Sequence, residues 1–346
     1  MEKQIIDIFS VTTIDYKDID RLQNVESKGN VKSKKDFPII KINDIDFLFK
    51  PLSKTKPLLT PFFGCAEVYW SYLVHFFINE NAPLYQLAVC RNIDAHQPKF
   101  RTQGTLVPNF LNNNETFENL YEYFMENPSA HTNDIKDYVN FCGIYYNYDS
   151  FYQTELFQNN PELMDQLSER ILISYLTDDQ NFHFENPGFC ISNEKELKMA
   201  PPFDYEFSSF FFNLDNQRKR SNYIEKKYIA TKDGLDNVVK YSPNVVSSFC
   251  EKLLHMIDFL KNAYFKVDNN PDYFYPFSGN DYVVGIKRYK EQNEQAALEI
   301  EAMLAKIEVI PEIYIEMVRK ETIEGASQLY YELKTRLDRH TLEKRI

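Results

Sequence analysis

Two short stretches of this chain concentrate residue types that could do chemistry. The stretch LTDDQNFHFENPGFCIS, residues 176–192, carries acids, amides and a histidine, and MAPPFD, residues 199–204, ends in Asp204. Acids and amides flanked by strand-like sequence serve either a turn or a metal ion, and hard oxygen ligands suit Mg²⁺. Asp204 is the hardest to assign to a turn, because an acid between aromatic residues needs a partner.

A lysine and a glutamate earlier in the chain extend this set. Lys50 ends the strand-like stretch FLFKP, and Glu67 lies among aromatic residues of the helix-like stretch FFGCAEVYWSYLVHFFI. Phosphoryl transfer uses these parts: a strand lysine holds nucleotide phosphates, a helix glutamate steadies the lysine, and an amide and a carboxylate hold magnesium. We therefore expect Asn186 and Asp204 to bind the metal.

Each of these residues also has a simpler structural interpretation. Lys50 could be a solvent-exposed strand end, and Glu67 a partly exposed helix residue. Asp179 could belong to a turn that ends a helix, His183 could order the loop, and Asn186 precedes a proline in an ordinary turn pair. The order and spacing of the whole set favour the chemical interpretation.

A sheet, a helix and a hairpin are needed to position these side chains. β-branched and aromatic patterning predicts strands at residues 4–11, 38–42, 45–51, 83–91 and 104–110. Asn43-Asp44 predicts a hairpin turn, and Thr60-Pro61 predicts the start of a helix that runs to about residue 78.

Helices predominate after residue 112. Apolar periodicity predicts them at residues 115–127, 131–142, 161–176, 243–264, 286–307 and 311–338. GFCIS and LKMAP flank the turn Asn193-Glu194 and predict a hairpin within this helical half. We expect an α+β, two-lobed protein, with a small β-rich lobe and one helix in residues 1–110 and a large helical lobe in residues 111–346.

Composition limits the classes of function. The 346 residues are 43% hydrophobic and 15% aromatic, which supplies a large core and excludes a disordered chain. A net charge of −12 argues against duplex nucleic acid as a partner. The five cysteines form no CxxC pair, which indicates reduced, mostly buried thiols in a cytosolic protein and argues against structural zinc. No stretch of ~18 apolar residues predicts a membrane span.

The two stretches resemble the signature of HipA-like serine/threonine kinases. YLTDDQNFHFENPGF and MAPPFD match that family's catalytic loop and metal aspartate without gaps, and FLFKP and CAEVYW match its strand lysine and helix glutamate. The matching positions are His183, Asn186, Gly188, Ala200, Pro201, Asp204, Lys50 and Glu67. The resemblance covers roughly residues 37–210 and has no motif-level counterpart in the last third.

The resemblance implies a protein-kinase-like fold that uses ATP and Mg²⁺ as cofactors. Lys50 and Glu67 would then act at the nucleotide, Asn186 and Asp204 at the metal, and the backbone near Val107–Phe110 would face the adenine. SKGNVKS, residues 27–33, is the best match to a phosphate-binding loop. The family contains toxins that phosphorylate translation components and are neutralised by DNA-binding antitoxins. The implied partners are therefore a protein substrate and a cognate antitoxin or regulatory protein, in the cytoplasm or, for a secreted effector, outside it.

The catalytic loop departs from the family at two positions. The family's catalytic Asp falls on Asn181, and the Arg that follows it falls on Phe182. An amide cannot accept the proton of a substrate hydroxyl, so the general base is missing at this position. Asp178 or Asp179 could supply it if the loop shifts by two residues, and Glu185 is a poorer candidate. A His at the position of His183 is structural in the family.

Three functions therefore stay open. The first is an ATP-dependent protein kinase, toxin-like or effector-like, with an altered catalytic loop. The second is a pseudokinase that binds nucleotide or a protein partner without efficient phosphoryl transfer. The third is a helical interaction protein that binds no nucleotide.

Overall fold

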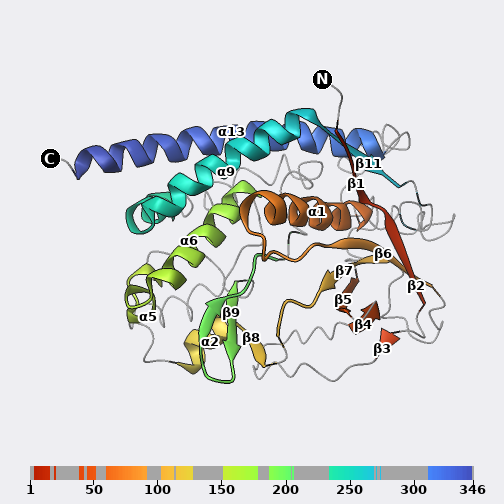
Figure 1. The fold of residues 1–346 in the computed structure, drawn as a ribbon, viewed down its shortest axis with the longest axis horizontal. Coiled ribbons are helices and arrows are strands. Elements are labelled where there is room, and N and C mark those ends of the chain that lie inside the picture. The colour runs from red at the N-terminus through yellow and green to blue at the C-terminus, as the bar shows by residue number, and fades with distance from the viewer. Residues whose placement is uncertain are drawn as a thin grey trace, which may run out of the picture.

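The structure, a computed structural model, combines helices and sheets in an α+β arrangement (Figure 1). It describes residues 4–15, 19–20, 39–42, 45–51, 60–91, 103–112, 114–127, 151–177, 187–203, 205, 234–268, 270, 273 and 311–344. Strands in this part of the chain form sheets of six, three and two strands. The α+β class expected from the sequence is therefore confirmed.

The six-stranded sheet contains most of the strands predicted in the first third of the chain. In spatial order its strands are β2 (Val11–Asp15), β6 (Gln86–Arg91), β7 (Gln103–Pro108), β5 (Ile45–Pro51), β4 (Ile39–Ile42) and β3 (Ile19–Asp20). β2 and β6 are parallel, and every other neighbouring pair is antiparallel. The strands predicted at 38–51, 83–91 and 104–110 thus lie in one sheet, as expected for a single β-rich unit.

Alternation along β5 gives the sheet two different faces. Phe47 and Phe49 enter a small apolar core on one face, whereas Leu48 packs against the main core on the other. Lys50 follows Leu48 by two residues and therefore shares the face that Leu48 presents to the main core. Val107 of β7 is buried in the same main core.

Helix α1 (Thr60–Leu73) packs against β1, β6 and β7 and continues into a π-helical turn, η2 (Val74–Ile78). The predicted helix to residue 78 is thus present, with a change of helical type after Leu73. Its middle is buried on all sides, since Cys65, Tyr69 and Trp70 have no exposed surface. A helix of this kind is a core element, so any charge within it is removed from water.

The N-terminal segment predicted as one strand is divided between two sheets. β1 (Gln4–Phe9) pairs in parallel with β11 (Ala263–Val267), and β2 begins after Ser10 in the six-stranded sheet. The irregular register between Asp7 and Phe9 accompanies this change of partner. Because β1 pairs with a strand from the C-terminal half, the lobe boundary at residue 110 stays a prediction.

Long helices follow after residue 150. They are α6 (Pro161–Leu176), α9 (Pro243–Asn262) and α13 (Pro311–Glu343), together with the short α5 (Glu155–Gln158) and a helix over 234–241. α9 and α13 lie side by side above α1 (Figure 1). The helix predicted at 243–264 was too long, because Ala263 is extended and the alternating stretch AYFKV forms β11. The helices predicted at 131–142 and 286–307 lie outside the described residues.

A three-stranded sheet lies beside α6 and corrects one helix prediction. Its strands are β8 (Glu115–Asn119), β9 (Gly188–Ser192) and β10 (Leu197–Met199), in the order β10-β9-β8. The helix predicted at 115–127 is only α2 (Leu120–Glu126), because the preceding residues pair with β9. Asn119 then caps α2 by accepting a hydrogen bond from the Glu122 backbone at 2.8 Å. The predicted hairpin at Asn193-Glu194 is confirmed as β9–β10.

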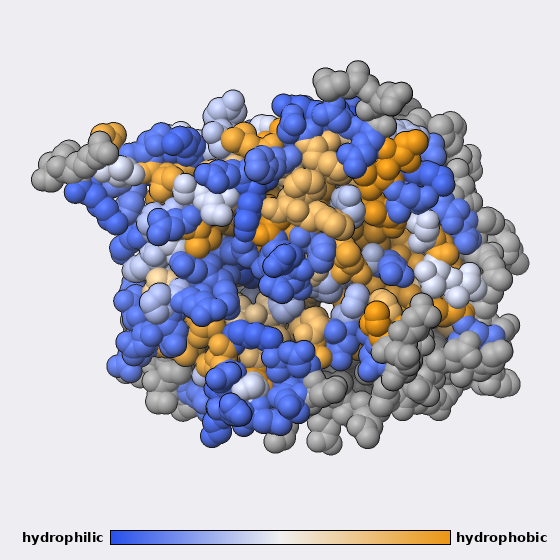
Figure 2. All heavy atoms as spheres, in the orientation of Figure 1, coloured by the Kyte–Doolittle hydropathy of each residue, from blue (hydrophilic) through white to orange (hydrophobic). Residues whose placement is uncertain are grey.

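The surface is mostly polar on the face shown in Figure 2, with apolar side chains exposed over α1 and along β1. The four described cysteines, Cys65, Cys90, Cys190 and Cys250, are buried free thiols. Among the described helices, none has both the length and the apolar composition needed to cross a bilayer.

Candidate functional site

The lysine and the glutamate singled out in the sequence meet in the structure. Lys50 Nζ, at the end of β5, forms an ion pair with Oε1 of Glu67 on α1. The Glu67 side chain is completely buried, and that of Lys50 is 14% exposed. The simpler interpretations, a solvent-exposed lysine and a half-exposed glutamate, are therefore wrong. The role of this pair in nucleotide binding stays a prediction.

The second carboxylate oxygen of Glu67 also has a donor. Thr105 Oγ1 donates a hydrogen bond to Glu67 Oε2 over 2.5 Å. Thr105 lies opposite Lys50 in the β5–β7 register and is itself fully buried. Charge and hydrogen bonding thus compensate Glu67 for its loss of water, as a buried carboxylate requires. Sequence reasoning missed Thr105, because GTLVP predicted a strand but not its register against FLFKP.

Gly104 lets β7 approach β5 closely enough for this arrangement. A Cβ at this position would lie 2.4 Å from the Phe49 ring and 2.6 Å from the Lys50 carbonyl oxygen. Neither neighbour is free to move, because Phe49 is buried and the carbonyl belongs to the sheet backbone. The missing side chain of Gly104 therefore sets the distance between the two strands that carry Lys50 and Thr105.

We expect Gly104→Ala to lower the free energy of unfolding by about 1–3 kcal/mol, the usual effect of overpacking. The same substitution should displace Lys50 and weaken any ligand held by it. Urea unfolding measures the first effect. Thr13→Ala is the control, because Thr13 is an exposed residue of β2 in the same sheet. Equal stability of Gly104→Ala and the control would show that the strands can separate without cost.

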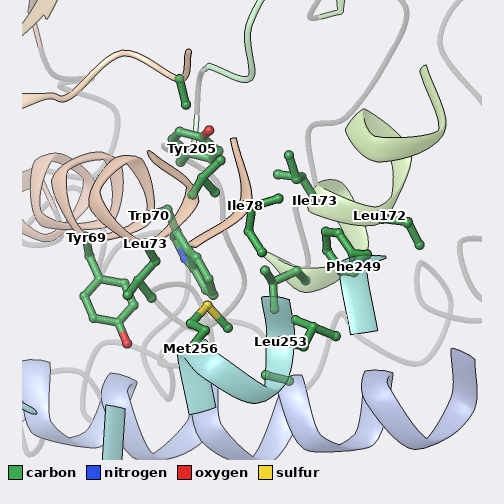
Figure 3. Packing of buried hydrophobic residues seen from close by; sticks show 14 of the residues in the cluster. Tyr69, Trp70, Leu73, Ile78, Leu172, Ile173, Tyr205, Phe249, Leu253 and Met256 are labelled. Atoms are coloured by element: carbon green, nitrogen blue, oxygen red, sulfur yellow. The ribbon is translucent and has the colours of Figure 1, made fainter. Parts of the chain in front are cut away.

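The helical part of the chain holds α1 in place. Figure 3 shows Trp70 of α1 close to Met256 of α9, and the Tyr69 hydroxyl directed toward α13. The Tyr69 hydroxyl donates to Thr322 Oγ1 of α13 at 3.1 Å, and burial raises the pKa of this phenol well above its ordinary value. Because Glu67 lies in the same helical turn, its position depends on packing against α9 and α13.

The C-terminal end of this helix is held by a lysine. Lys252 of α9 donates to the Ile78 carbonyl at 2.6 Å and pairs with Glu169 of α6 at 3.0 Å. Asn79 donates to the other oxygen of Glu169 at 2.7 Å. The Ile78 carbonyl at the end of η2 thus accepts a hydrogen bond from a cation, a favourable arrangement at a helix C-terminus. α1 and η2 are thus held in the middle of α1 and at the C-terminal end of η2.

Val107 and Phe110, the two residues predicted to lie near an adenine, differ from each other in their surroundings. Val107 is buried in the main core. Phe110, just beyond β7, stacks on Phe203 with ring centroids 5.5 Å apart and meets the edge of Phe117 of β8 at 6.3 Å. The end of β7 therefore lies next to the residue that immediately precedes Asp204 in the sequence.

Phe203 is itself firmly held. Arg170 of α6 donates to the Phe203 carbonyl at 2.8 Å, and its guanidinium lies 5.6 Å from the centre of the Phe203 ring. Arg170 is 4% exposed, so this is a buried cation that binds a backbone carbonyl. On the other side of Asp204, Tyr205 is buried in the main core. Neither Arg170 nor Phe110 could be assigned to this task from the sequence.

The β9–β10 hairpin is anchored on the same helix. The Met199 backbone donates to Gln166 of α6 at 2.8 Å, and the Ala200 backbone donates to the Gly188 carbonyl at 2.8 Å. Gly188 is required by close packing, because a Cβ there would lie 2.4 Å from the Glu118 carbonyl oxygen. These two hydrogen bonds thus fix the direction in which the chain leaves the hairpin at MAPP.

The predicted catalytic-loop residues lie outside the described residues. They are Asp179, Asn181, His183 and Asn186. Asp204 and the predicted phosphate-binding loop, residues 27–33, also lie outside the described residues. The loop's flanks are described: Thr177 caps α6, and Pro187 precedes β9. Within the part of the chain that the structure covers, no group of three or more His, Cys, Asp or Glu could hold a metal ion. The assignment of Asn186 and Asp204 to magnesium stays a prediction.

The fold and site define an α+β protein with a buried lysine–glutamate pair between a mostly antiparallel sheet and a core helix. No protein-family model matches the chain, and no curated protein matches it either. Among solved structures it is similar to the crystal structure of a Helicobacter pylori proinflammatory kinase, CtkA. The two are 14% identical with a TM-score of 0.41, over 95% of this chain and 99% of that chain. A TM-score of this size does not by itself define a shared fold.

Proposed function

We propose that this protein is an ATP- and Mg²⁺-dependent serine/threonine kinase of the HipA-like type, with an altered catalytic loop. The observation that carries the proposal is the buried ion pair between Lys50 and Glu67. A protein has little reason to bury an isolated ion pair for stability, because desolvation offsets most of the attraction. A lysine at the end of a sheet strand, held by a helix glutamate, is, however, what phosphate binding needs.

The residues would divide the work as follows. Lys50 would bind the nucleotide phosphates, and Glu67, itself held by Thr105, would keep the Lys50 ammonium in position. Asn186 and Asp204 would bind magnesium, which neutralises phosphate charge when bound. The contact of Phe110 with Phe203 supports this division, since it links the end of β7 to the segment that carries Asp204.

A pseudokinase is the second candidate, and the catalytic loop itself favours it. Asn181 and Phe182 replace the Asp and Arg of the family, so the general base is missing at its usual position. Lys50, Asn186 and Asp204 would bind nucleotide in either case. The two candidates therefore differ in phosphoryl transfer and not in ATP binding.

We expect ATP to raise the unfolding temperature of the protein more with Mg²⁺ than without it. A ligand at about 100 times its Kd adds about 2.7 kcal/mol of stability, which thermal unfolding resolves easily. Asp204→Ala should remove the magnesium-dependent part and leave the unfolding temperature without ligand nearly unchanged. Equal stabilisation by ATP with and without Mg²⁺ would contradict the metal site. No stabilisation under either condition would exclude both nucleotide-binding candidates and favour the helical interaction protein.

A further inference from the structure

The helix that carries Glu67 is held on two opposite sides. Glu67 accepts hydrogen bonds from Lys50 and Thr105 of the six-stranded sheet. Tyr69 follows two residues later and projects about 200° further round the helix, since an α-helix turns about 100° per residue. Its hydroxyl donates a hydrogen bond to Thr322 Oγ1 of α13 at 3.1 Å (Figure 3). The sheet therefore holds one side of α1, and the C-terminal helix holds the other.

The hydrogen bond between Tyr69 and Thr322 is buried and fixed in direction. Neither residue has exposed surface. Thr322 donates its own proton to the Val318 carbonyl at 2.8 Å, one turn earlier in α13, so its oxygen meets Tyr69 as an acceptor. Water therefore has no access to replace this bond.

α13 is itself anchored one turn away from Thr322. Arg319, which is 8% exposed, donates to the Leu260 carbonyl at the end of α9. Its other two nitrogens donate to the two carboxylate oxygens of Glu316 at 2.6 and 2.7 Å. Residues three apart are neighbours on a helix surface, so Arg319 fixes the turn that presents Thr322 to α1.

Ring packing alone constrains the rotation of α1 less tightly than this hydrogen bond does. The Tyr69 ring meets the ring of Phe265 of β11 at 5.2 Å between centroids. Aromatic pairs are favourable over centroid distances of about 4.5–7 Å, whereas a hydrogen bond between hydroxyls needs about 2.5–3.0 Å and weakens as it bends. The bond to Thr322 therefore limits how far α1 can turn, and the turn of α1 decides how Glu67 meets Lys50.

We propose that Thr322 is a positioning residue for Glu67 and acts through Tyr69, so that the C-terminal helix contributes to nucleotide affinity. The proposal rests on the proposed function, in which Glu67 holds Lys50 for the nucleotide phosphates. It assigns a task to the last third of the chain, in which the sequence has no motif-level counterpart to the kinase family.

A double-mutant cycle on ATP affinity, measured by titration calorimetry, tests whether Thr322 acts through Glu67. Thr322→Val keeps the shape of the side chain and removes the acceptor, so α1 should turn and ATP affinity should fall about three- to tenfold, the usual size for one hydrogen bond. Thr322→Ser keeps the hydroxyl and should retain the wild-type affinity. In the Glu67→Gln background, Thr322→Val should change affinity by less than about twofold, because no carboxylate is left to position. Equal losses in both backgrounds, or a loss of stability with unchanged affinity, would overturn the proposal.

Thr154→Val is the matched control. Thr154 is also fully buried, and its hydroxyl donates to the Phe151 carbonyl at 2.9 Å, next to α5. The control should lower the urea midpoint and leave ATP affinity unchanged. If it weakens ATP binding as much as Thr322→Val does, general loosening explains both losses and the positioning role is wrong.

A second cycle in urea, without nucleotide, separates this inference from the proposed function. Lys50→Met should lower the urea midpoint less in the Thr322→Val background than in the wild type, because Glu67 is then already displaced from Lys50. Residues that share no contacts otherwise give additive shifts. If the wild type binds no ATP, the proposed function fails, and this cycle still decides whether Thr322 positions Glu67. Additive shifts would overturn the positioning role, whatever the protein binds.

Discussion

Lys50→Met is expected to lower the free energy of unfolding by about 3–5 kcal/mol, because it leaves the Glu67 carboxylate buried without its cation. Glu67 has no exposed surface, so water cannot replace the lysine without disruption of the core. Thr105 would remain as a donor to the carboxylate. Urea unfolding of the purified variant measures the loss.

The double variant Lys50→Met/Glu67→Gln should recover most of that stability. The neutral amide can still accept the hydrogen bond of Thr105 and no longer needs a cation, so the cost of a buried charge disappears. ATP binding should nevertheless be lost in both the single and the double variant, which separates the function of Lys50 from its effect on stability.

A matched control is available at an exposed ion pair. Lys266 pairs with Asp7 at 3.0 Å, and the two side chains are 57% and 43% exposed. Lys266→Met should cost little stability, because water and salt screen an exposed ion pair. If Lys50→Met costs no more than Lys266→Met, the carboxylate of Glu67 is not desolvated in solution. If Lys50→Met binds ATP as tightly as the wild type, Lys50 does not hold the nucleotide.

Asn181→Asp is expected to raise the rate of phosphoryl transfer. General-base help contributes roughly 10²–10⁴-fold in such reactions, whereas positioning and charge stabilisation supply most of the rest. The wild type should therefore transfer phosphate weakly or not at all, and the variant should gain up to that factor. Labelled ATP with Mg²⁺, followed by detection of self-phosphorylation, measures the change.

Asp179→Asn is the companion experiment for the catalytic loop. If Asp179 has taken over as the base, Asp179→Asn abolishes transfer and Asn181→Asp adds little. If Asn181 marks a lost base, Asp179→Asn has little effect and Asn181→Asp restores activity. Strong wild-type activity that neither substitution changes would contradict both assignments. ATP affinity should stay the same in both variants, since neither residue is assigned to nucleotide binding.

Local sequence patterns were sufficient for most individual elements. The helix at 161–176, the hairpin at Asn193-Glu194 and the strands that flank Lys50 are present, because alternation, turn residues and helical periodicity act over a few residues. The pairing of Lys50 with Glu67 was expected from the residues that phosphoryl transfer uses, whereas local patterning indicated only that a lone acid in an apolar helix needs solvent or a cation.

Interactions between distant segments were not predictable in the same way. Thr105 reaches Glu67 only because β5 and β7 pair in one particular register, and a shift by one residue would turn its side chain to the other face. The stretch at 115–119 was predicted as helix, yet it pairs with β9, so tertiary contacts override its local preference. Arg170 and Thr322 were missed for the same reason, because their partners are far away in sequence.

The parallel pair of β1 and β11 also has a consequence for the order of synthesis. Asp7 and Lys266, which join these strands, are 259 positions apart in the chain. At about 5–20 residues per second, a ribosome needs about 13–50 s to make the intervening residues. During that interval QIIDIF has no partner strand, although its Ile6 and Phe9 belong to the main core. A nascent chain must therefore carry an unpaired apolar strand for most of its translation, which is the period when such a strand is exposed to wrong pairing.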